Sequence, residues 1–271
     1  SAIMHAGLVN AGGFLLARFA PLFFDLPGML TAVLAAGLVS AVLGTLWKLM
    51  QQDIKRMLAC STMAQMGFMM VQCGLGLFPA AVAHLCWHGM YKAFLFLNSG
   101  GAARDKRLNT QGPPGFLALI LALACGAAGS YGFAVASGKP WLPTDTTLVL
   151  VAVAFVAGAQ FALAVMRRRP LARLPLALPL TVAMGLLYGG SVRLVEAILA
   201  PDGLAQPQPL NAFHVAAILL LLGAWLAMLL RRNPGDERAS DRALALYVKA
   251  VNASQPHPST VTAQPNHYNP I

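Results

Sequence analysis

The sequence predicts an all-α protein, a polytopic bundle of about eight transmembrane helices. Of its 271 residues, 58% are hydrophobic and 10% are charged, whereas soluble domains carry about 25% charged residues. Apolar runs recur at about the twenty residues that a helix needs to cross the hydrocarbon of a bilayer, and a helix satisfies its own backbone in lipid. This composition excludes a disordered chain, a collagen, a coiled coil and an ordinary cytosolic enzyme.

Eight apolar runs follow one another along the chain, with proline at most of the joints. They cover residues 1–19, 28–49, 54–75, 78–100, 115–137, 146–166, 174–199 and 210–230. We therefore expect a transmembrane domain over residues 1–232 and a polar tail over 233–271. Within the tail, Leu244, Val248 and Val251 form a weak apolar stripe that predicts a short amphipathic helix over 238–251. That helix would lie on the membrane face or against a partner; a disordered tail is the alternative.

The charges predict the orientation of the bundle. The net charge is +10, from 19 Lys and Arg against 9 Asp and Glu. If the helices alternate in direction, two basic residues, Arg18 and Lys139, lie on one side of the membrane and twelve lie on the other. The twelve are Lys48, Lys55, Arg56, Arg104, Lys106, Arg107, Arg167, Arg168, Arg169, Arg173, Arg231 and Arg232. The positive-inside rule then predicts a multi-pass protein of the cell inner membrane with its C-terminus in the cytoplasm. We interpret the basic excess as a topology signal, not as a nucleic-acid site.

The run over residues 78–100 carries three polar residues inside an apolar stretch. His84, His88 and Lys92 stand at i, i+4 and i+8, which places them on one face of a helix across about 12 Å. An ammonium at mid-membrane costs about 2.5 to 3.5 kcal/mol, so such a residue normally faces a cavity or a partner. Because imidazole titrates near neutrality, the row predicts a proton relay. The alternatives are a snorkelling Lys92 and hydrogen-bonded structural histidines.

Other polar residues have simpler interpretations. His5, in the first run, is a relay member, a ligand or a core histidine. Asp53 suits the N-cap of a helix, and Lys55 with Arg56 after it suits the cytoplasmic topology signal.

Two further features point to structure or location more than to chemistry. Arg193 and Glu196 are spaced to pair within one helix, and His214 is expected at the interface. The cysteines lack a CxxC spacing, so we expect small hydrophobes and no metal site. They are Cys60, Cys73, Cys86 and Cys125.

Three segments of the first hundred residues carry a family resemblance. They read SAIMHA at 1–6, QDIKRMLACSTMAQMG at 52–67 and HLCWHGMYKAFLFL at 84–97. In this order they resemble the antiporter-like subunits of respiratory complex I and of Mrp antiporters. The resemblance implies the second half of a proton-translocating subunit, with His5 as the histidine of its opening segment. It places His84, His88 and Lys92 on the central hydrophilic axis.

The resemblance also implies residues that this sequence does not contain. The family has an essential glutamate and lysine on earlier helices, and the chain opens at Ser1 without an initiator methionine, so we expect the back part of a longer protein. The family also has a broken helix with a lysine or glutamate where residues 116–137 carry no charge. The proton exit is therefore not identified by the resemblance.

The tail carries a second resemblance. LYVK at 246–249, NASQPHP at 252–258 and NHY at 266–268 resemble the C-terminus of the membrane subunit of DAB inorganic-carbon accumulation complexes. This implies a non-enzymatic subunit that couples influx of H+, or of Na+, to carbon accumulation by a large cytoplasmic zinc-containing, carbonic-anhydrase-like partner. The zinc would belong to the partner, and no cofactor is expected in this chain. The residues expected to dock the partner are Tyr247, Asn252, Gln255, His257, His267 and Tyr268.

Two other functions remain open at this point. One is a proton-pumping subunit of a respiratory NADH-quinone oxidoreductase or of an Mrp-type cation/proton antiporter. The other is a membrane anchor whose charges only pair structurally.

Overall fold

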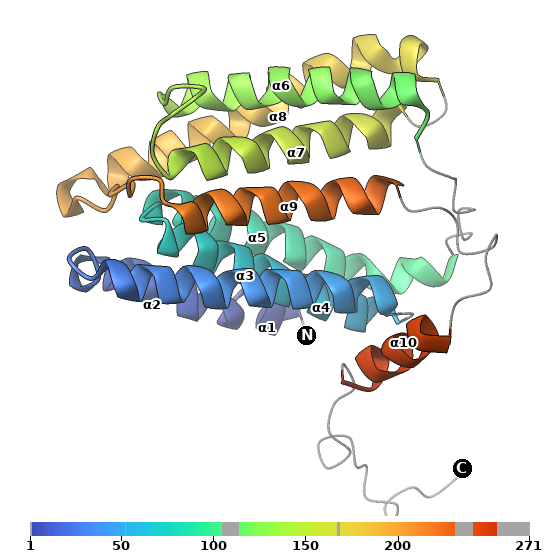
Figure 1. Ribbon diagram of the computed structural model, residues 1–271, viewed down its shortest axis with the longest axis horizontal. Coiled ribbons are helices and arrows are strands. Elements are labelled where there is room, and N and C mark those ends of the chain that lie inside the picture. The colour runs from blue at the N-terminus through green and yellow to red at the C-terminus, as the bar shows by residue number, and fades with distance from the viewer. Residues whose placement is uncertain (1, 52, 105–113, 167–168, 231–240, 254–271) are drawn as a thin grey trace, which may run out of the picture.

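A computed structural model describes residues 2–51, 53–104, 114–166, 169–230 and 241–253, and over these residues the protein folds into helices (Figure 1). The α-helices are α1 (Ala2–Ala6), α2 (Ala11–Arg18), α3 (Pro27–Met50), α4 (Ile54–Gly74), α5 (Phe78–Leu97), α6 (Phe116–Ser137), α7 (Thr147–Met166), α8 (Pro170–Ile198), α9 (Ala212–Leu230) and α10 (Asp241–Ala253). Short 3-10 turns join some of them: η1 (Leu8–Asn10), η2 (Ala20–Leu22), η3 (Asn98–Arg104) and η4 (Ala200–Asp202).

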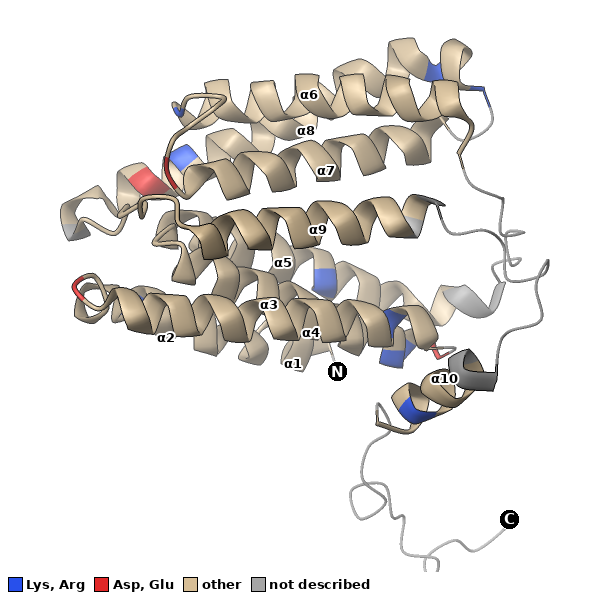
Figure 2. Ribbon diagram, viewed as in Figure 1, with Lys and Arg blue, Asp and Glu red and all other residues tan. Residues whose placement is uncertain are grey.

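Helices occupy each of the expected apolar runs, and four of those in the described part of the chain are long and apolar enough to cross a membrane. These four, judged by length and composition, are α3, α6, α7 and α8, and α9 holds a shorter apolar stretch, Ala212–Ala227. The all-α membrane fold is thus confirmed, whereas a count of about eight spans stays a prediction. Charged residues gather mainly at the helix ends (Figure 2), as expected of helices whose middle lies in hydrocarbon.

The first run differs from the expected continuous helix. It is broken into α1, η1 and α2, with the break following Gly7. Glycine has a low helix propensity, which favours a break at this point. The Asn10 Nδ2 group donates a hydrogen bond to the Ala6 carbonyl at 2.8 Å. A Cβ atom on Gly89 of α5 would lie 3.1 Å from the same carbonyl. The irregular backbone is therefore satisfied by a side chain and covered by protein, as the interior of a bilayer requires.

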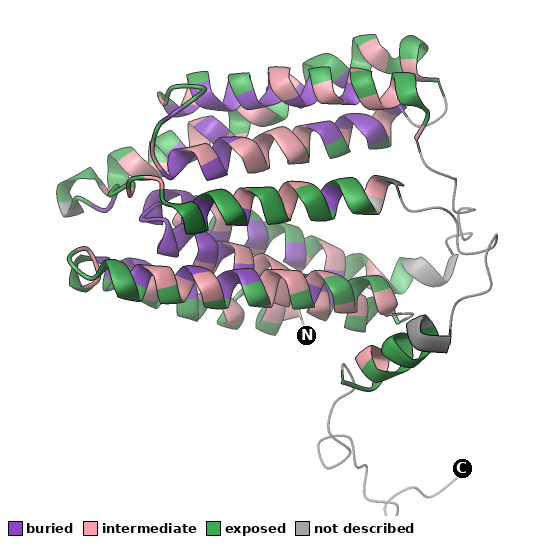
Figure 3. Ribbon diagram, in the orientation of Figure 1, coloured by how far each residue is buried: buried purple, intermediate pink, exposed green. Residues whose placement is uncertain are grey.

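The helices form two groups that meet along α5 and α8. In the first group α3 packs along α4, while α1, α2 and α4 pack on α5; in the second, α6 lies against α7 and α8 (Figure 1). The α3–α4 contact depends on glycine, because a Cβ on Gly37 would lie 2.7 Å from the Gly67 carbonyl oxygen. Buried residues line the facing sides of the groups, whereas α9 and α10 are largely exposed (Figure 3).

The segment before α9 ties together loops at one end of the bundle. Gln206 N donates to Gly76 O at 3.1 Å, and Thr146 N donates to Gln208 O at 2.9 Å. Gly76 has a φ of 75°, in the left-handed region that favours glycine. His214, expected at the interface, is buried at the start of α9, where its Nδ1 accepts the Asn211 N–H at 3.3 Å. These bonds hold the end of the bundle that lies away from α10.

Candidate functional site

Two residues of the row predicted on α5, His88 and Lys92, are buried, and His84 is half-buried. His88 is 4% exposed and Lys92 is 0% exposed. The rings of His84 and His88 face each other with centroids 6.1 Å apart and an interplanar angle of 18°. Phe68 of α4 packs beside His84 with ring centroids 5.5 Å apart. The 3.6-residue period of the helix therefore brings the two imidazoles together, as the spacing predicted.

Lys92 turns toward α4 and does not reach for the membrane surface. Its Nζ donates to the Leu58 carbonyl oxygen at 3.0 Å, and the Thr62 hydroxyl donates to the same oxygen at 3.0 Å. A snorkelling lysine keeps its ammonium in water, whereas this side chain is fully buried. The snorkelling alternative is therefore wrong, and the ammonium lies against a backbone carbonyl inside the bundle.

His5 joins the same region from the broken first helix. Its ring stacks on Phe96 of α5, with centroids 4.7 Å apart and planes 5° from parallel. Phe96 lies one helical turn beyond Lys92. The break in the first run thus places His5 beside the end of the α5 row that lies nearest Lys92.

The histidines of this cluster have polar atoms without partners. Among the described residues nothing hydrogen-bonds His5 Nδ1, His84 Nε2 or either ring nitrogen of His88, and these atoms are buried. Buried polar groups are normally hydrogen-bonded, because an unpaired one costs about 1 to 3 kcal/mol. A structural histidine would show such a bond. The arrangement instead offers nitrogens that are ready to accept or donate a proton.

A cavity of about 510 Å³ lies between the α5 row and the second helix group. His84 and His88 form part of one wall, together with Gln65, Trp87 and Tyr91. The opposite wall comes from α6, α7 and α8, and includes Phe133, Gly158, Thr181, Gly185 and Tyr188. Ligand and solvent cavities of this size are typically apolar with a few convergent polar groups, and here the imidazoles are such groups.

The cytoplasmic-side candidates lie at a helix start. Asp53 caps α4, because its Oδ1 accepts the Arg56 backbone N–H at 2.8 Å. Asp53, Lys55 and Arg56 are all exposed. The capping interpretation of Asp53 is therefore confirmed.

The tail candidates are described only in part. The short helix expected over 238–251 is found as α10, Asp241–Ala253, where Tyr247 and Asn252 are exposed. Leu244, 54% exposed, and Val248, 48% exposed, leave an apolar stripe open beside Tyr247. Gln255, His257, His267 and Tyr268 lie outside the described residues.

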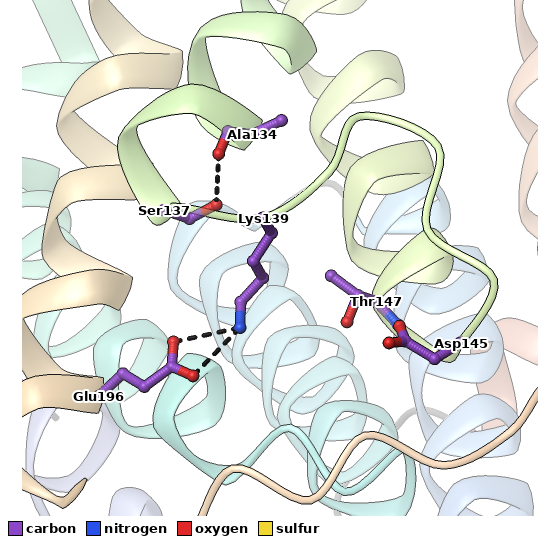
Figure 4. A network of polar contacts seen from close by, with 6 residues as sticks. All are labelled: Ala134, Ser137, Lys139, Asp145, Thr147 and Glu196. Carbon is purple, nitrogen blue, oxygen red and sulfur yellow. Dashed lines mark hydrogen bonds and ion pairs between the residues drawn. The ribbon is translucent and has the colours of Figure 1, made fainter.

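The expected pair of Arg193 with Glu196 is wrong. Glu196 instead accepts from Lys139 Nζ, with both carboxylate oxygens at 3.1 Å (Figure 4). Lys139 follows α6 and Glu196 lies near the end of α8, so the ion pair joins two helices, while Arg193 is exposed. Packing of α6 on α8 brings the lysine to the carboxylate, a contact that spacing within one helix does not reveal.

Sequence reasoning also missed two polar residues next to the cavity. Gln72 is 1% exposed and its Nε2 donates to the Tyr188 hydroxyl at 3.5 Å. The two residues lie 116 positions apart, so no local pattern links them. A buried glutamine on an apolar helix is the one sign in the sequence that a partner was needed.

The first part of the chain matches known proteins. Residues 1–112 match the family described as "NADH:quinone oxidoreductase/Mrp antiporter, TM". "Probable inorganic carbon transporter subunit DabB1" of Halothiobacillus neapolitanus is 50% identical over 107 residues, 40% of this chain and 19% of the relative. "Probable inorganic carbon transporter subunit DabB" of Bacillus subtilis is 50% identical over 111 residues, 41% of this chain and 22% of the relative.

A redox-complex subunit matches the same region. "NAD(P)H-quinone oxidoreductase subunit 5, chloroplastic" of Brachypodium distachyon is 50% identical over 101 residues, 37% of this chain and 14% of the relative. The matches to the inorganic carbon transporter subunits span about a fifth of those relatives' length. Over residues 1–112, which hold His5 and the whole α5 row, the resemblance to the complex I and Mrp antiporter-like membrane subunits is confirmed.

Proposed function

We propose that this chain is part of an ion-conducting membrane subunit that couples the influx of a cation, H+ in the first instance, to the accumulation of inorganic carbon. The observation that carries the proposal is the cluster of His5, His84, His88 and Lys92, in which His88 and Lys92 are buried and four ring nitrogens of the histidines lack partners among the described residues. Imidazoles accept and release protons near neutral pH. A row of them beside a cavity suits stepwise proton transfer better than it suits a scaffold.

In the proposed topology all eight helical segments span the cell inner membrane. The C-terminus then lies in the cytoplasm. The broken α1–α2 segment and the polar helices α4 and α5 cross inside the bundle, where other helices satisfy their polar groups. The basic excess on one side, which includes Lys48 and Arg173, supports this orientation. The tail then lies where a cytoplasmic partner can reach it.

The proposed partner is a large cytoplasmic zinc protein of carbonic-anhydrase type, which would hold the zinc and the catalytic chemistry. The bacterial relatives are named as subunits of inorganic carbon transporters, which supports the existence of a partner; its zinc and carbonic-anhydrase character rest on the resemblance of the tail. One charge crossing 100 mV releases about 2.3 kcal/mol, against about 1.4 kcal/mol per tenfold gradient. One ion per substrate therefore drives an accumulation of about fortyfold, so the coupling is energetically feasible.

The second candidate is a proton-pumping subunit of a quinone oxidoreductase, favoured by the match to the chloroplastic subunit 5. Purification of the full-length protein in a mild detergent separates the two. A co-purifying zinc protein of carbonic-anhydrase type supports the carbon-accumulation function. Co-purifying flavin or iron–sulfur subunits would overturn it in favour of the second candidate.

The ion is identified by reconstituting the full-length complex in lipid vesicles. An imposed pH gradient should drive proton uptake that a Na+ gradient of the same size does not reproduce. Uptake driven by Na+ alone would contradict H+ as the coupling ion. Leak through empty vesicles is the baseline.

The tail is tested by deletion. If residues 252–268 contact the partner, their removal releases the soluble subunit from the membrane while insertion of the membrane subunit stays normal. Pull-down of the partner with the tagged membrane subunit measures this. A partner retained at the level of the intact protein would show that the segment does not dock it.

A further inference from the structure

The α5 row ends at His84. Helix α6, which faces the row across the cavity, carries no charged residue. A proton that moves between the row and the side of the membrane opposite α10 therefore needs another carrier. Hydroxyl groups on the far wall of the cavity are the candidates, since a hydroxyl can accept a proton on its oxygen and release its own. Two such groups, from Thr181 and Tyr188, line the far wall.

The hydrogen bonds show which of these two hydroxyls has a proton available for transfer. Thr181 Oγ1 donates to the Ala177 carbonyl of its own helix at 2.7 Å. The Thr181 hydroxyl proton is therefore already used in a hydrogen bond within α8. The Tyr188 hydroxyl is an acceptor, from Gln72 Nε2 at 3.5 Å. Among the described residues no acceptor takes the Tyr188 hydroxyl proton. That proton is free to point into the cavity.

The surroundings hold Tyr188 in place. Its ring stacks on Phe133, with centroids 5.8 Å apart and an interplanar angle of 26°. Gln72 is almost fully buried, and its Oε1 has no partner among the described residues. The amide nitrogen of Gln72 therefore holds the Tyr188 hydroxyl oxygen in place.

Water has room between His84 and Tyr188. The cavity volume of about 510 Å³ compares with about 30 Å³ per molecule in liquid water. A buried water needs two to four polar partners, and the side chains of His84, His88 and Tyr188, which line the cavity, carry polar groups of this kind. Much of the remaining lining is apolar, including Phe68, Phe133 and Leu150.

We propose that Tyr188 is the next proton carrier after His84, reached through water on the polar side of the cavity, and that Gln72 is its positioning residue. For inward flow, a hydronium ion that arrives from the side of the membrane opposite α10 gives H+ to the Tyr188 oxygen and becomes water. The hydroxyl proton passes to a cavity water, and that water gives a proton to His84 Nε2. The Tyr188 hydroxyl and the cavity water each end with the same number of protons as before, and the hydroxyl rotates back to its starting position. The inference rests on the proposed function.

Farther along α8, Glu196 stands eight residues beyond Tyr188, about 12 Å along the same face. Its carboxylate, paired with Lys139 and 30% exposed on its side chain, is the nearest acidic group on α8 toward the membrane surface. The proposed path therefore leads from the buried row to this ion pair.

The test measures proton uptake by the full-length complex in vesicles under an imposed pH gradient. Tyr188→Phe removes one oxygen atom and keeps the ring, so uptake should fall by about 10²-fold or more, the usual loss on removing a proton-transfer group. Gln72→Leu should lower uptake less. Tyr188→His supplies a new proton carrier and should restore part of the uptake, with a pH dependence that the wild type does not show. Tyr131→Phe, at an exposed tyrosine on α6, is the matched control and should leave uptake unchanged.

A second pair of variants tests the water. Ala154→Leu on α7 fills the cavity and should slow uptake severalfold, whereas Ala164→Leu at an exposed position on the same helix should not. Full uptake by Tyr188→Phe, with none by Lys92→Met, overturns this inference and leaves the proposed function standing. Loss in Tyr188→Phe without rescue by Tyr188→His, and without an effect of Ala154→Leu, assigns Tyr188 a structural role and also overturns it. Full uptake by Lys92→Met refutes the proposed function itself.

Discussion

Replacing Lys92 with methionine should abolish ion flow while leaving the stability of the protein almost unchanged. The variant loses the hydrogen bond from Nζ to Leu58 O, and a bond to a charged group contributes about 1.5 to 3 kcal/mol. It also removes an ammonium from the bundle interior, which costs about 2.5 to 3.5 kcal/mol at mid-membrane. The Leu58 carbonyl keeps the Thr62 hydroxyl as a donor, so it is not left unpaired.

These opposing contributions nearly cancel, and methionine fills a similar volume. We therefore expect the free energy of unfolding to change by no more than about 1 kcal/mol. Lys92→Ala should instead lower it by about 2 to 5 kcal/mol, because a cavity is left. Thermal unfolding of the purified full-length protein in lipid nanodiscs measures the difference.

Ion flow should respond differently from stability. Lys92→Met removes a proton-transfer group, so uptake into vesicles should fall by about 10²-fold or more. Lys92→Arg keeps the positive charge but holds its proton at all relevant pH values, so it should be as inactive as methionine. Lys249→Met, at an exposed position on α10, is the control. An active Lys92→Arg variant would show that charge alone is needed at this position, and would refute a relay through Lys92.

Three further predictions concern the framework of the site. Asp53→Ala should lower stability by about 1 kcal/mol in a thermal melt, because α4 loses its N-cap; an unchanged melt would show that the cap contributes nothing. Single neutral substitutions of Lys139 or Glu196 should cost at most about 1 kcal/mol, since both side chains are partly exposed, and exchanging the two residues should recover most of the loss in a double-mutant cycle. Gly67→Ala should impair folding, because its Cβ would lie 2.7 Å from the Gly37 carbonyl oxygen, whereas Gly223→Ala meets open space; equal expression and melting of the two variants would contradict the close packing of α3 on α4.

Composition and periodicity were sufficient for the helical membrane fold and for the row on α5. A helix repeats every 3.6 residues, so the spacing of His84, His88 and Lys92 already places them on one face. The N-cap role of Asp53 is likewise local, since the cap bonds the backbone three residues away. In these cases the interacting groups lie within a few turns of each other.

Tertiary packing decided the rest, because the relevant partners are far apart in the chain. The partner of Glu196 is Lys139, 57 positions away, and that of Gln72 is Tyr188. The burial of the Lys92 ammonium against Leu58 O follows from how α4 lies on α5. No pattern within one helix shows which side chain of another helix will satisfy a buried polar group. The sequence therefore identified which residues needed partners, and the packing of the two helix groups determined which partners they found.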